Sequence, residues 1–190
     1  MPSRSSPRRP DVTDTQLIGG VEKRSIEILD YDERWPERYL AQEHRIREAL
    51  ATAHVRIEHI GSTSVPGLAA KPIIDVLIVV EDITAEEDHV EPLVRAGYEL
   101  RVREPGHRLV RTPERDVHVH LLEQGDPGIE AYLLLRDQLR ADAADRALYA
   151  GTKRELAARE WEDMNAYAEA KSEVIGAILR HARLYREVAE

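Results

Sequence analysis

The stretch from Ile57 to Val80, which reads IEHIGSTSVPGLAAKPIIDVLIVV, decides how this chain folds. Its last part, residues 72–80, is almost wholly apolar and rich in β-branched side chains, which predicts a strand buried on much of both faces. Residues 55–60 predict a second strand, which ends at Gly61. The segment therefore predicts two strands joined by a loop rich in Gly, Ser and Pro.

The segments around this stretch alternate between extended and helical patterns. Residues 25–29 predict a short strand, and residues 31–53 predict a helix with Pro36 near its start. Thr84–Glu87 has the pattern of a capping box, and the helix that it opens is expected to end at Gly97. Three further strands, punctuated by turns, are expected at 98–103, 108–112 and 116–122.

The last third of the chain has a helical pattern throughout. Asp126-Pro127 is a typical helix start, and two more helices are expected at about 143–158 and 161–187. The order of elements is not the regular alternation of a doubly wound fold. It indicates an α+β fold with a mixed or antiparallel sheet, helices on one face of the sheet and a helical C-terminal third.

Length and composition favour one domain. We expect it to span residues 21–190, with a sheet core at 25–125 and a helical part at 126–188. Residues 1–20 are rich in Ser, Pro and Arg without an apolar period, so we expect a disordered tail.

The same composition excludes or disfavours several classes of function. The chain has 190 residues, 27 basic and 36 acidic side chains, and no Cys, which excludes thiol chemistry and Cys-ligated zinc. A net charge of −9 argues against nucleic acid as the partner. No apolar run is long enough for a bilayer span or a signal peptide, so we expect a cytoplasmic protein without a membrane partner.

The Gly61-Ser62-Thr63-Ser64 turn is a candidate phosphate site. Glycine permits close backbone approach, and hydroxyl and N–H groups suit phosphate oxygens. The same residue types are also common in ordinary turns, which is the alternative interpretation.

Asp75 and two histidines are the candidate reactive side chains. Asp75 lies in an apolar strand, where a carboxylate needs a partner, a metal or a solvent-filled cleft; alternation places it with Ile73 and Leu77 on one face. His118 and His120 share one face of a strand and could ligate a metal, bind phosphate or relay a proton. The alternatives are a structural salt bridge at Asp75 and two histidines on a solvated face.

At these residues the sequence resembles the GrpB (UPF0157) family, whose members are similar to the nucleotidyltransferase superfamily that includes DNA polymerase beta. The resemblance covers roughly residues 25–185. Beyond the GSTSVPGL-x-x-KP-x-x-D string, it rests on these residues: Tyr31, Trp35, His118, His120, Tyr132, Arg136, Asp137, Leu139, Arg140, Tyr149, Lys153, Tyr167 and Lys171. A related domain resembles the C-terminal extension of some bacterial dephospho-CoA kinases.

The resemblance implies a mechanism in which the Gly-Ser turn binds a nucleoside triphosphate and paired carboxylates hold divalent metal ions. This sequence departs from that pattern, because Leu77 occupies the position of the second carboxylate and the His118/His120 face stands where a third is expected. One Asp and two His suit zinc, manganese or iron better than magnesium.

Cationic side chains complete the expected ligand site. Lys71 and Arg136 are candidates to neutralise phosphate charge, with an ordinary surface lysine and a helix-surface salt bridge as alternatives. The Tyr149/Lys153 and Tyr167/Lys171 pairs are spaced four residues apart, which favours helix packing with lysines that extend to solvent.

The sequence thus predicts a nucleotidyltransferase-like protein that binds a nucleotide or another phosphorylated small molecule and transfers a nucleotidyl group to a hydroxyl or amine acceptor. Asp75, His118 and His120 are the expected catalytic and metal-binding residues. A catalytically inactive ligand-binding or chaperone-like partner domain is the alternative, and a metal-dependent hydrolase that uses the same three residues is a third.

Overall fold

A six-stranded mixed sheet forms the centre of the molecule. The computed structural model describes residues 8–22, 26–51, 55–159, 161 and 164–189. The strands are β1 (Gln16–Leu17), β2 (Arg56–Ile60), β3 (Ile74–Val80), β4 (Glu99–Glu104), β5 (His107–Arg111) and β6 (Val117–Glu123). They lie in the order β1-β4-β5-β6-β3-β2, and every pair is antiparallel except the parallel pair β3–β6. The expected α+β fold with a mixed sheet is confirmed.

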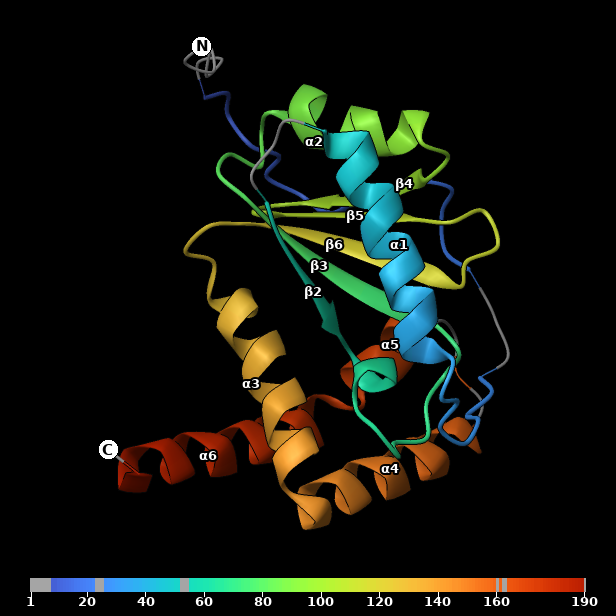
Figure 1. Cartoon of the computed structure of the whole chain (residues 1–190), viewed down its shortest axis with the longest axis vertical. Helices are drawn as coiled ribbons and strands as arrows, with labels where there is room; N and C mark the ends of the chain where they lie inside the picture. The colour runs from blue at the N-terminus through green and yellow to red at the C-terminus, as the bar shows by residue number, and fades with distance from the viewer. Residues whose placement is uncertain (1–7, 23–25, 52–54, 160, 162–163, 190) are drawn as a thin grey trace.

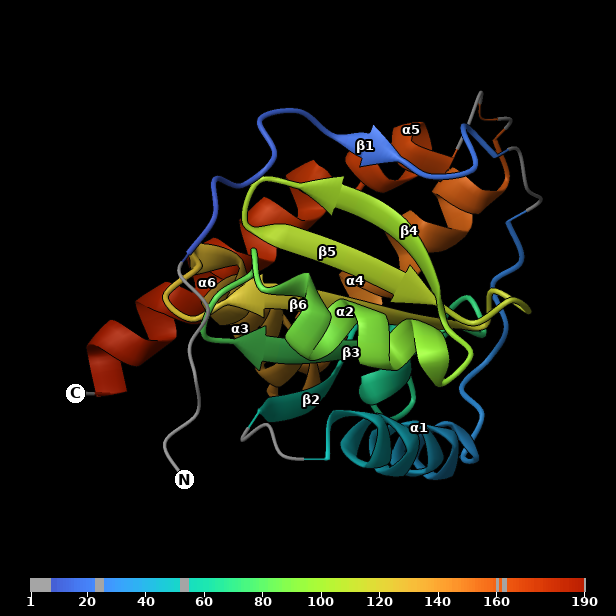
Figure 2. The same cartoon turned by 90° about the horizontal axis from the view of Figure 1, so that it is seen from above.

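Helices cover the two faces of this sheet. The helices are α1 (Trp35–Leu50), α2 (Glu86–Arg95), α3 (Pro127–Ala141), α4 (Ala143–Ala157), α5 (Met164–Glu169) and α6 (Ser172–Ala189). Helices α1 and α2 lie on one face, and the C-terminal helices lie on the other (Figures 1 and 2). None of the helices in the described part of the chain combines the length and apolar character of a membrane span.

Alternation along β3 assigns its side chains to the two faces. Ile74, Val76 and Ile78 are fully buried in the main core against α1 and α2. Asp75 and Leu77 face the C-terminal helices, where Leu77 packs in a smaller apolar cluster. Because β3 lies between β2 and β6, this arrangement places a carboxylate on the inner part of the sheet.

The C-terminal helices pack against the loop that links β2 to β3. Asp126 caps α3 by accepting a hydrogen bond from the backbone N–H of Gly128 (2.7 Å), as the Asp-Pro start predicts. An apolar cluster joins the loop to α3, α4 and α6 through Val65, Leu68, Leu139, Tyr149, Val174 and Ile178. The single helix expected at 161–187 is instead divided into α5 and α6.

The expectation of a disordered tail at residues 1–20 is wrong for residues 8–20. Strand β1 pairs with the edge strand β4, and Arg108 donates a hydrogen bond to Asp11 (2.5 Å). The segment lacks an apolar period because ion pairs and strand pairing hold it, so periodicity could not reveal it. Residues 1–7 lie outside the described part of the chain.

Two local expectations are also corrected. The capping box does not form, because the Thr84 hydroxyl donates to Asp82 (2.6 Å) and the N-cap residue, Ala85, makes no side-chain hydrogen bond. The strand expected at 25–29 is reduced to a bridge between Leu29 and Ala70 in the described residues, and residue 25 lies outside them.

Candidate functional site

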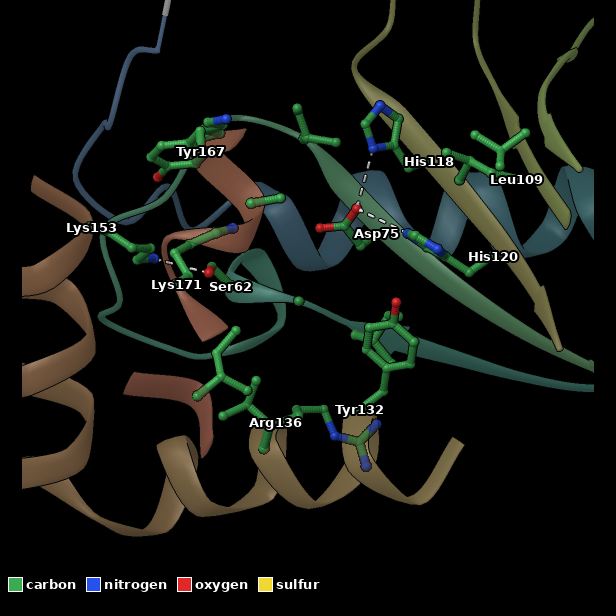
Figure 3. A pocket seen from close by; sticks show the side chains of 18 of the residues that line it. Ser62, Asp75, Leu109, His118, His120, Tyr132, Arg136, Lys153, Tyr167 and Lys171 are labelled. Atoms are coloured by element: carbon green, nitrogen blue, oxygen red, sulfur yellow. Dashed lines mark hydrogen bonds and ion pairs between the residues drawn. The ribbon is translucent and has the colours of Figure 1, made fainter. Parts of the chain in front are cut away.

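A cavity of about 620 Å³ opens between the sheet and the C-terminal helices (Figure 3). Its lining combines apolar side chains with a cluster of ionisable groups. Seven of the residues expected at the site line it: Gly61, Ser62, Lys71, Asp75, His118, His120 and Arg136. The structure therefore brings most of the expected site together in one place.

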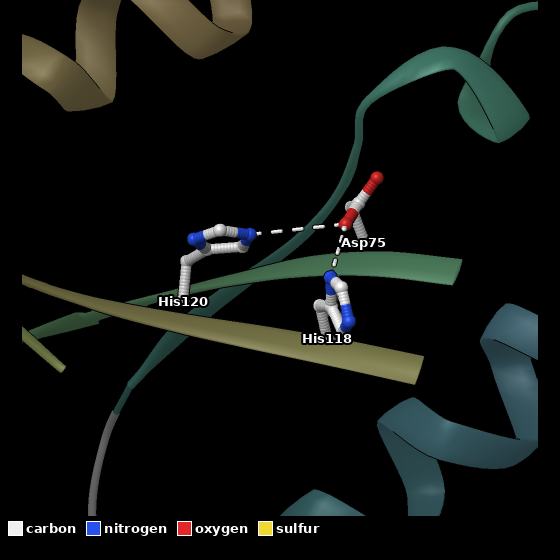
Figure 4. Close-up of side chains that lie close together, drawn as sticks. All are labelled: Asp75, His118 and His120. Atoms are coloured by element: carbon white, nitrogen blue, oxygen red, sulfur yellow. Dashed lines mark ion pairs between the residues drawn. The ribbon is translucent and has the colours of Figure 1, made fainter. Parts of the chain in front are cut away.

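Asp75, His118 and His120 converge on one point in this cavity (Figure 4). The parallel pairing of β3 with β6 sets Asp75 beside His118. Asp75 Oδ1 lies 3.6 Å from His118 Nδ1 and 3.7 Å from His120 Nε2. These separations are long for hydrogen bonds but suit donor atoms that share one metal ion at about 2 Å.

The charges around Asp75 keep its carboxylate ionised. Burial raises its pKa, but the neighbouring His120, His118 and Lys171 side chains outweigh burial, so the net shift is downward. Leu77, the next residue on this face, is fully buried and apolar. The cluster therefore offers one carboxylate oxygen and two imidazole nitrogens, a donor set that could hold one cation.

Two residues that sequence reasoning missed lie behind His120. His120 Nδ1 is 3.1 Å from His107 Nε2, and His107 Nδ1 is 2.5 Å from Glu104 Oε1. Burial lowers the pKa of His107 and His120 lowers it further, although Glu104 opposes them. The signal was the alternation that puts His107 and Leu109 on one face, which is usable only once β5 is known to pair with β6.

A buried lysine, Lys153, and a half-buried one, Lys171, were also missed, because their spacing suggested ordinary helix packing. Lys153 turns inward from α4, with 3% exposure, and donates to Ser62 Oγ (2.9 Å) and to the carbonyl of Ala69 (2.5 Å). Burial, together with the charges of Lys171 and Arg154, lowers its pKa to about 7, although Asp75 opposes them. Burial also lowers the pKa of Lys171, although Asp75 opposes it.

Lys71 adds a third ammonium group to this end of the cavity. Its Nζ lies 3.8 Å from the ring centroid of Tyr167, and Lys171 Nζ lies 4.8 Å from the same centroid. Three lysines that line one cavity create a local excess of positive charge in a chain that is acidic overall. Such a surface suits an anionic ligand.

The other expected phosphate-binding residues have different surroundings. Thr63 and Ser64 are buried in a short 3₁₀ turn, and their hydroxyls donate to the carbonyls of Ile73 (3.1 Å) and Gly61 (2.6 Å). They do not line the cavity, so the phosphate role expected of them is not supported. Arg136 lines it but donates to Glu58 (2.8 Å), which neutralises much of its charge.

Gly61 is the residue that allows the turn and Asp75 to approach each other. It has φ +69°, and a Cβ at this position would overlap the Asp75 carboxylate. We expect Gly61→Ala to destabilise the fold and weaken metal binding. Gly67→Ala is the control, because Gly67 has φ +77° but no heavy atom within 4 Å of the point that a Cβ would occupy.

Urea unfolding and metal titration of both variants test this expectation. A left-handed alanine costs roughly 1–2 kcal/mol in each variant. The additional loss in Gly61→Ala measures the overlap with Asp75. Equal effects of the two substitutions on stability and on metal affinity would contradict the expected contact.

A family model described as GrpB protein matches residues 25–181 of the chain. The chain is 60% identical over 182 residues to the UPF0157 protein SCO7215 of Streptomyces coelicolor, covering 96% of this chain and 97% of that protein. It is 30% identical over 180 residues to a dephospho-CoA kinase of Mycolicibacterium paratuberculosis, covering 80% of this chain but 44% of the kinase.

Solved structures resemble this chain at two levels, the GrpB family and the wider fold. The crystal structure of the conserved protein GrpB from Enterococcus faecalis aligns with a TM-score of 0.74 and 31% identity, over 86% of this chain and all of that one. A structure of the Cid1 poly(U) polymerase with bound MgGTP aligns with a TM-score of 0.51 and 18% identity. That alignment covers 70% of this chain and 45% of Cid1, and it shows a shared fold.

Proposed function

Because this chain belongs to the GrpB family and has a nucleotidyltransferase-like fold, we propose that it binds a nucleoside triphosphate or similar phosphorylated small molecule in the cavity. We further propose that it transfers the nucleotidyl group to a hydroxyl or amine acceptor with the help of one divalent metal ion. The observation that carries the proposal is that one cavity contains both a candidate cation site (Asp75, His118 and His120) and a lysine cluster (Lys71, Lys153 and Lys171).

The donor set at the cation site selects among metals. Asp75, His118 and His120 offer one carboxylate oxygen and two imidazole nitrogens, which fit zinc or manganese better than the all-oxygen environment typical of magnesium. A metal bound there supplies a Lewis acid that polarises a phosphate oxygen. Leu77 offers no second carboxylate, so the residues support one metal site and not the two-metal arrangement.

The lysine cluster is suited to hold the charged end of the ligand. Lys153 is buried and Lys171 is half-buried, and both have lowered pKa values because burial disfavours their positive charge. Phosphate oxygens offer the compensating charge and the hydrogen-bond acceptors that these ammonium groups need. Ser62, which already contacts Lys153, adds a hydroxyl to the same group. The apolar remainder of the cavity is available to the organic part of the ligand.

A second candidate function is ligand binding without transfer. Two observations favour it, namely the apolar Leu77 at the expected second carboxylate position and the match to part of a dephospho-CoA kinase. Such a domain would bind a phosphorylated ligand through the lysine cluster but would not catalyse nucleotidyl transfer.

Thermal unfolding with nucleoside triphosphates, coenzyme A precursors and Zn²⁺, Mn²⁺ or Mg²⁺ tests the two functions. We expect a nucleotide and a transition metal together to raise the melting temperature more than the sum of their separate effects. A ligand at 100 times its Kd stabilises by about 2.7 kcal/mol, which is easily detected. Pyrophosphate release in the presence of small alcohols and amines then separates transfer from binding. Stabilisation without release supports the binding domain, and the absence of any shift contradicts both functions.

A further inference from the structure

We propose that Glu104 and His107 are positioning residues that fix the tautomer of His120, so that its Nε2 lone pair points at Asp75. The inference rests on the metal site of the proposed function and assigns a role to two residues outside the metal ligands. The four side chains form a continuous line across the sheet face, from Glu104 on β4 through His107 on β5 and His120 on β6 to Asp75 on β3.

The direction of the hydrogen bonds follows from the carboxylate at the outer end. An ionised carboxylate only accepts, so the short contact between Glu104 and His107 places the proton on His107 Nδ1. A neutral His107 then has a bare Nε2, which accepts from Nδ1–H of His120 across 3.1 Å. A neutral His120 in this tautomer has no proton on Nε2.

This tautomer affects the contact between His120 and Asp75, at the end of the row of side chains opposite Glu104. The bare Nε2 of His120 faces the Asp75 carboxylate oxygen across 3.7 Å, and neither atom carries a proton to share. Two lone pairs that face each other favour a cation between them. The Nδ1 atom of His118, 3.6 Å from the same oxygen, completes a three-sided site. Hydrogen-bonded partners behind metal-binding histidines commonly act in this way.

Packing restrains the two rings in the same orientation. The His107 and His120 rings are stacked, with centroids 5.3 Å apart and planes at 10°, and Tyr132 lies against His120 from α3. His107 and Glu104 face each other across the β4–β5 hairpin. The rigid sheet therefore supports the line of side chains.

Nitrogen NMR of the metal-free protein at pH 8 tests the tautomer directly. We expect His120 in the wild type to carry its proton on Nδ1, with the His120→Asn spectrum providing the assignment. Glu104→Gln keeps the size of the side chain, but its amide can donate as well as accept. It therefore no longer fixes which nitrogen of His107 carries the proton, and we expect a mixture of His120 tautomers. A wild-type His120 protonated on Nε2 would overturn the proposal.

Cobalt titration followed by absorbance tests the effect on the site. We expect His107→Leu to weaken Co²⁺ binding by roughly 10–100-fold, the usual cost of losing such a partner. His107→Gln, whose amide oxygen can accept from His120, is expected to restore part of the affinity. His44→Gln, at an exposed position on α1, is the control and is expected to bind as the wild type does.

The outcomes separate this inference from the proposed function. Wild-type affinity in a folded His107→Leu variant, as checked by thermal unfolding, would overturn the positioning role. A wild type that binds no Co²⁺ would overturn the metal in the proposed function, and the tautomer of His120 would then decide the positioning role alone.

Discussion

Asp75→Asn is expected to abolish tight metal binding, with a loss in affinity of more than roughly 100-fold. Loss of a residue that only hydrogen-bonds to a metal ligand costs up to about 100-fold, and Asp75 is itself a proposed ligand. Asp75 is the only carboxylate of the three-residue site, and its charge offsets that of the bound cation. The amide is nearly the same size, so the cavity keeps its shape while the anionic ligand is lost. Calorimetric titration with Zn²⁺ and Mn²⁺ measures the change.

Asp137→Asn is a matched control for this substitution. Asp137 lies on α3 beside the cavity residue Arg136, and its side chain is 49% exposed. We expect wild-type metal affinity in this variant. In the Asp75→Asn variant, the joint stabilisation by nucleotide and metal should also disappear. An Asp75→Asn protein that binds metal within a few-fold of the wild type would exclude the proposed site.

Lys153→Met is expected to weaken the binding of a phosphorylated ligand by roughly 100-fold, because it removes a buried cation that interacts with phosphate oxygens. A loss of that size corresponds to about 2.7 kcal/mol, which is within the range for a hydrogen bond between charged groups. Isothermal titration with the ligand identified by thermal unfolding measures it. Metal binding at Asp75 should be largely retained, because Lys153 is not one of the three ligands.

The same substitution is expected to change the pH dependence of stability. The pKa of Lys153 is about 7 in the folded protein against 10.5 for an ordinary lysine. Between these values the unfolded chain binds more protons, so Lys153 makes the free energy of unfolding rise with pH. We therefore expect Lys153→Met to have its highest stability relative to the wild type at pH 7 and below, and to lose that advantage toward pH 10.

Urea unfolding at several pH values measures this difference. Arg95→Met, at an exposed position on α2, is the control, and its stability relative to the wild type should vary little between pH 7 and pH 10. A difference between Lys153→Met and the wild type that does not change from pH 7 to pH 10 would contradict the lowered pKa.

Local patterns in the sequence were sufficient for strands β2 to β6 and for part of the site. The apolar run at 72–80 predicts β3, and the two-residue period places Asp75 on one face and His118 with His120 on one face. Asp126-Pro127 predicts the start of α3 for an equally local reason. These features depend on neighbours within a few residues, so no long-range information is needed.

The tertiary structure decided which of these faces meet. The parallel β3–β6 pairing places Asp75 beside His118, although they are far apart in the sequence. The antiparallel β5–β6 pairing adds His107 to the site. Strand partners depend on packing of the whole chain, and a period of two does not specify them.

The orientation of the helices was also a tertiary outcome. Lys153 has the spacing of a lysine that reaches solvent, but the packing of α4 against the Gly61–Leu68 loop turns it toward Ser62. Ion pairs and pairing with β4 likewise hold residues 8–20, which have no apolar period. The sequence by itself thus determined strands β2 to β6 and the ligand-bearing faces, because these follow from local periodicity. Only the tertiary structure decided the lysine cluster and the position of the Glu104–His107 pair behind His120, because both depend on contacts between separate helices or strands.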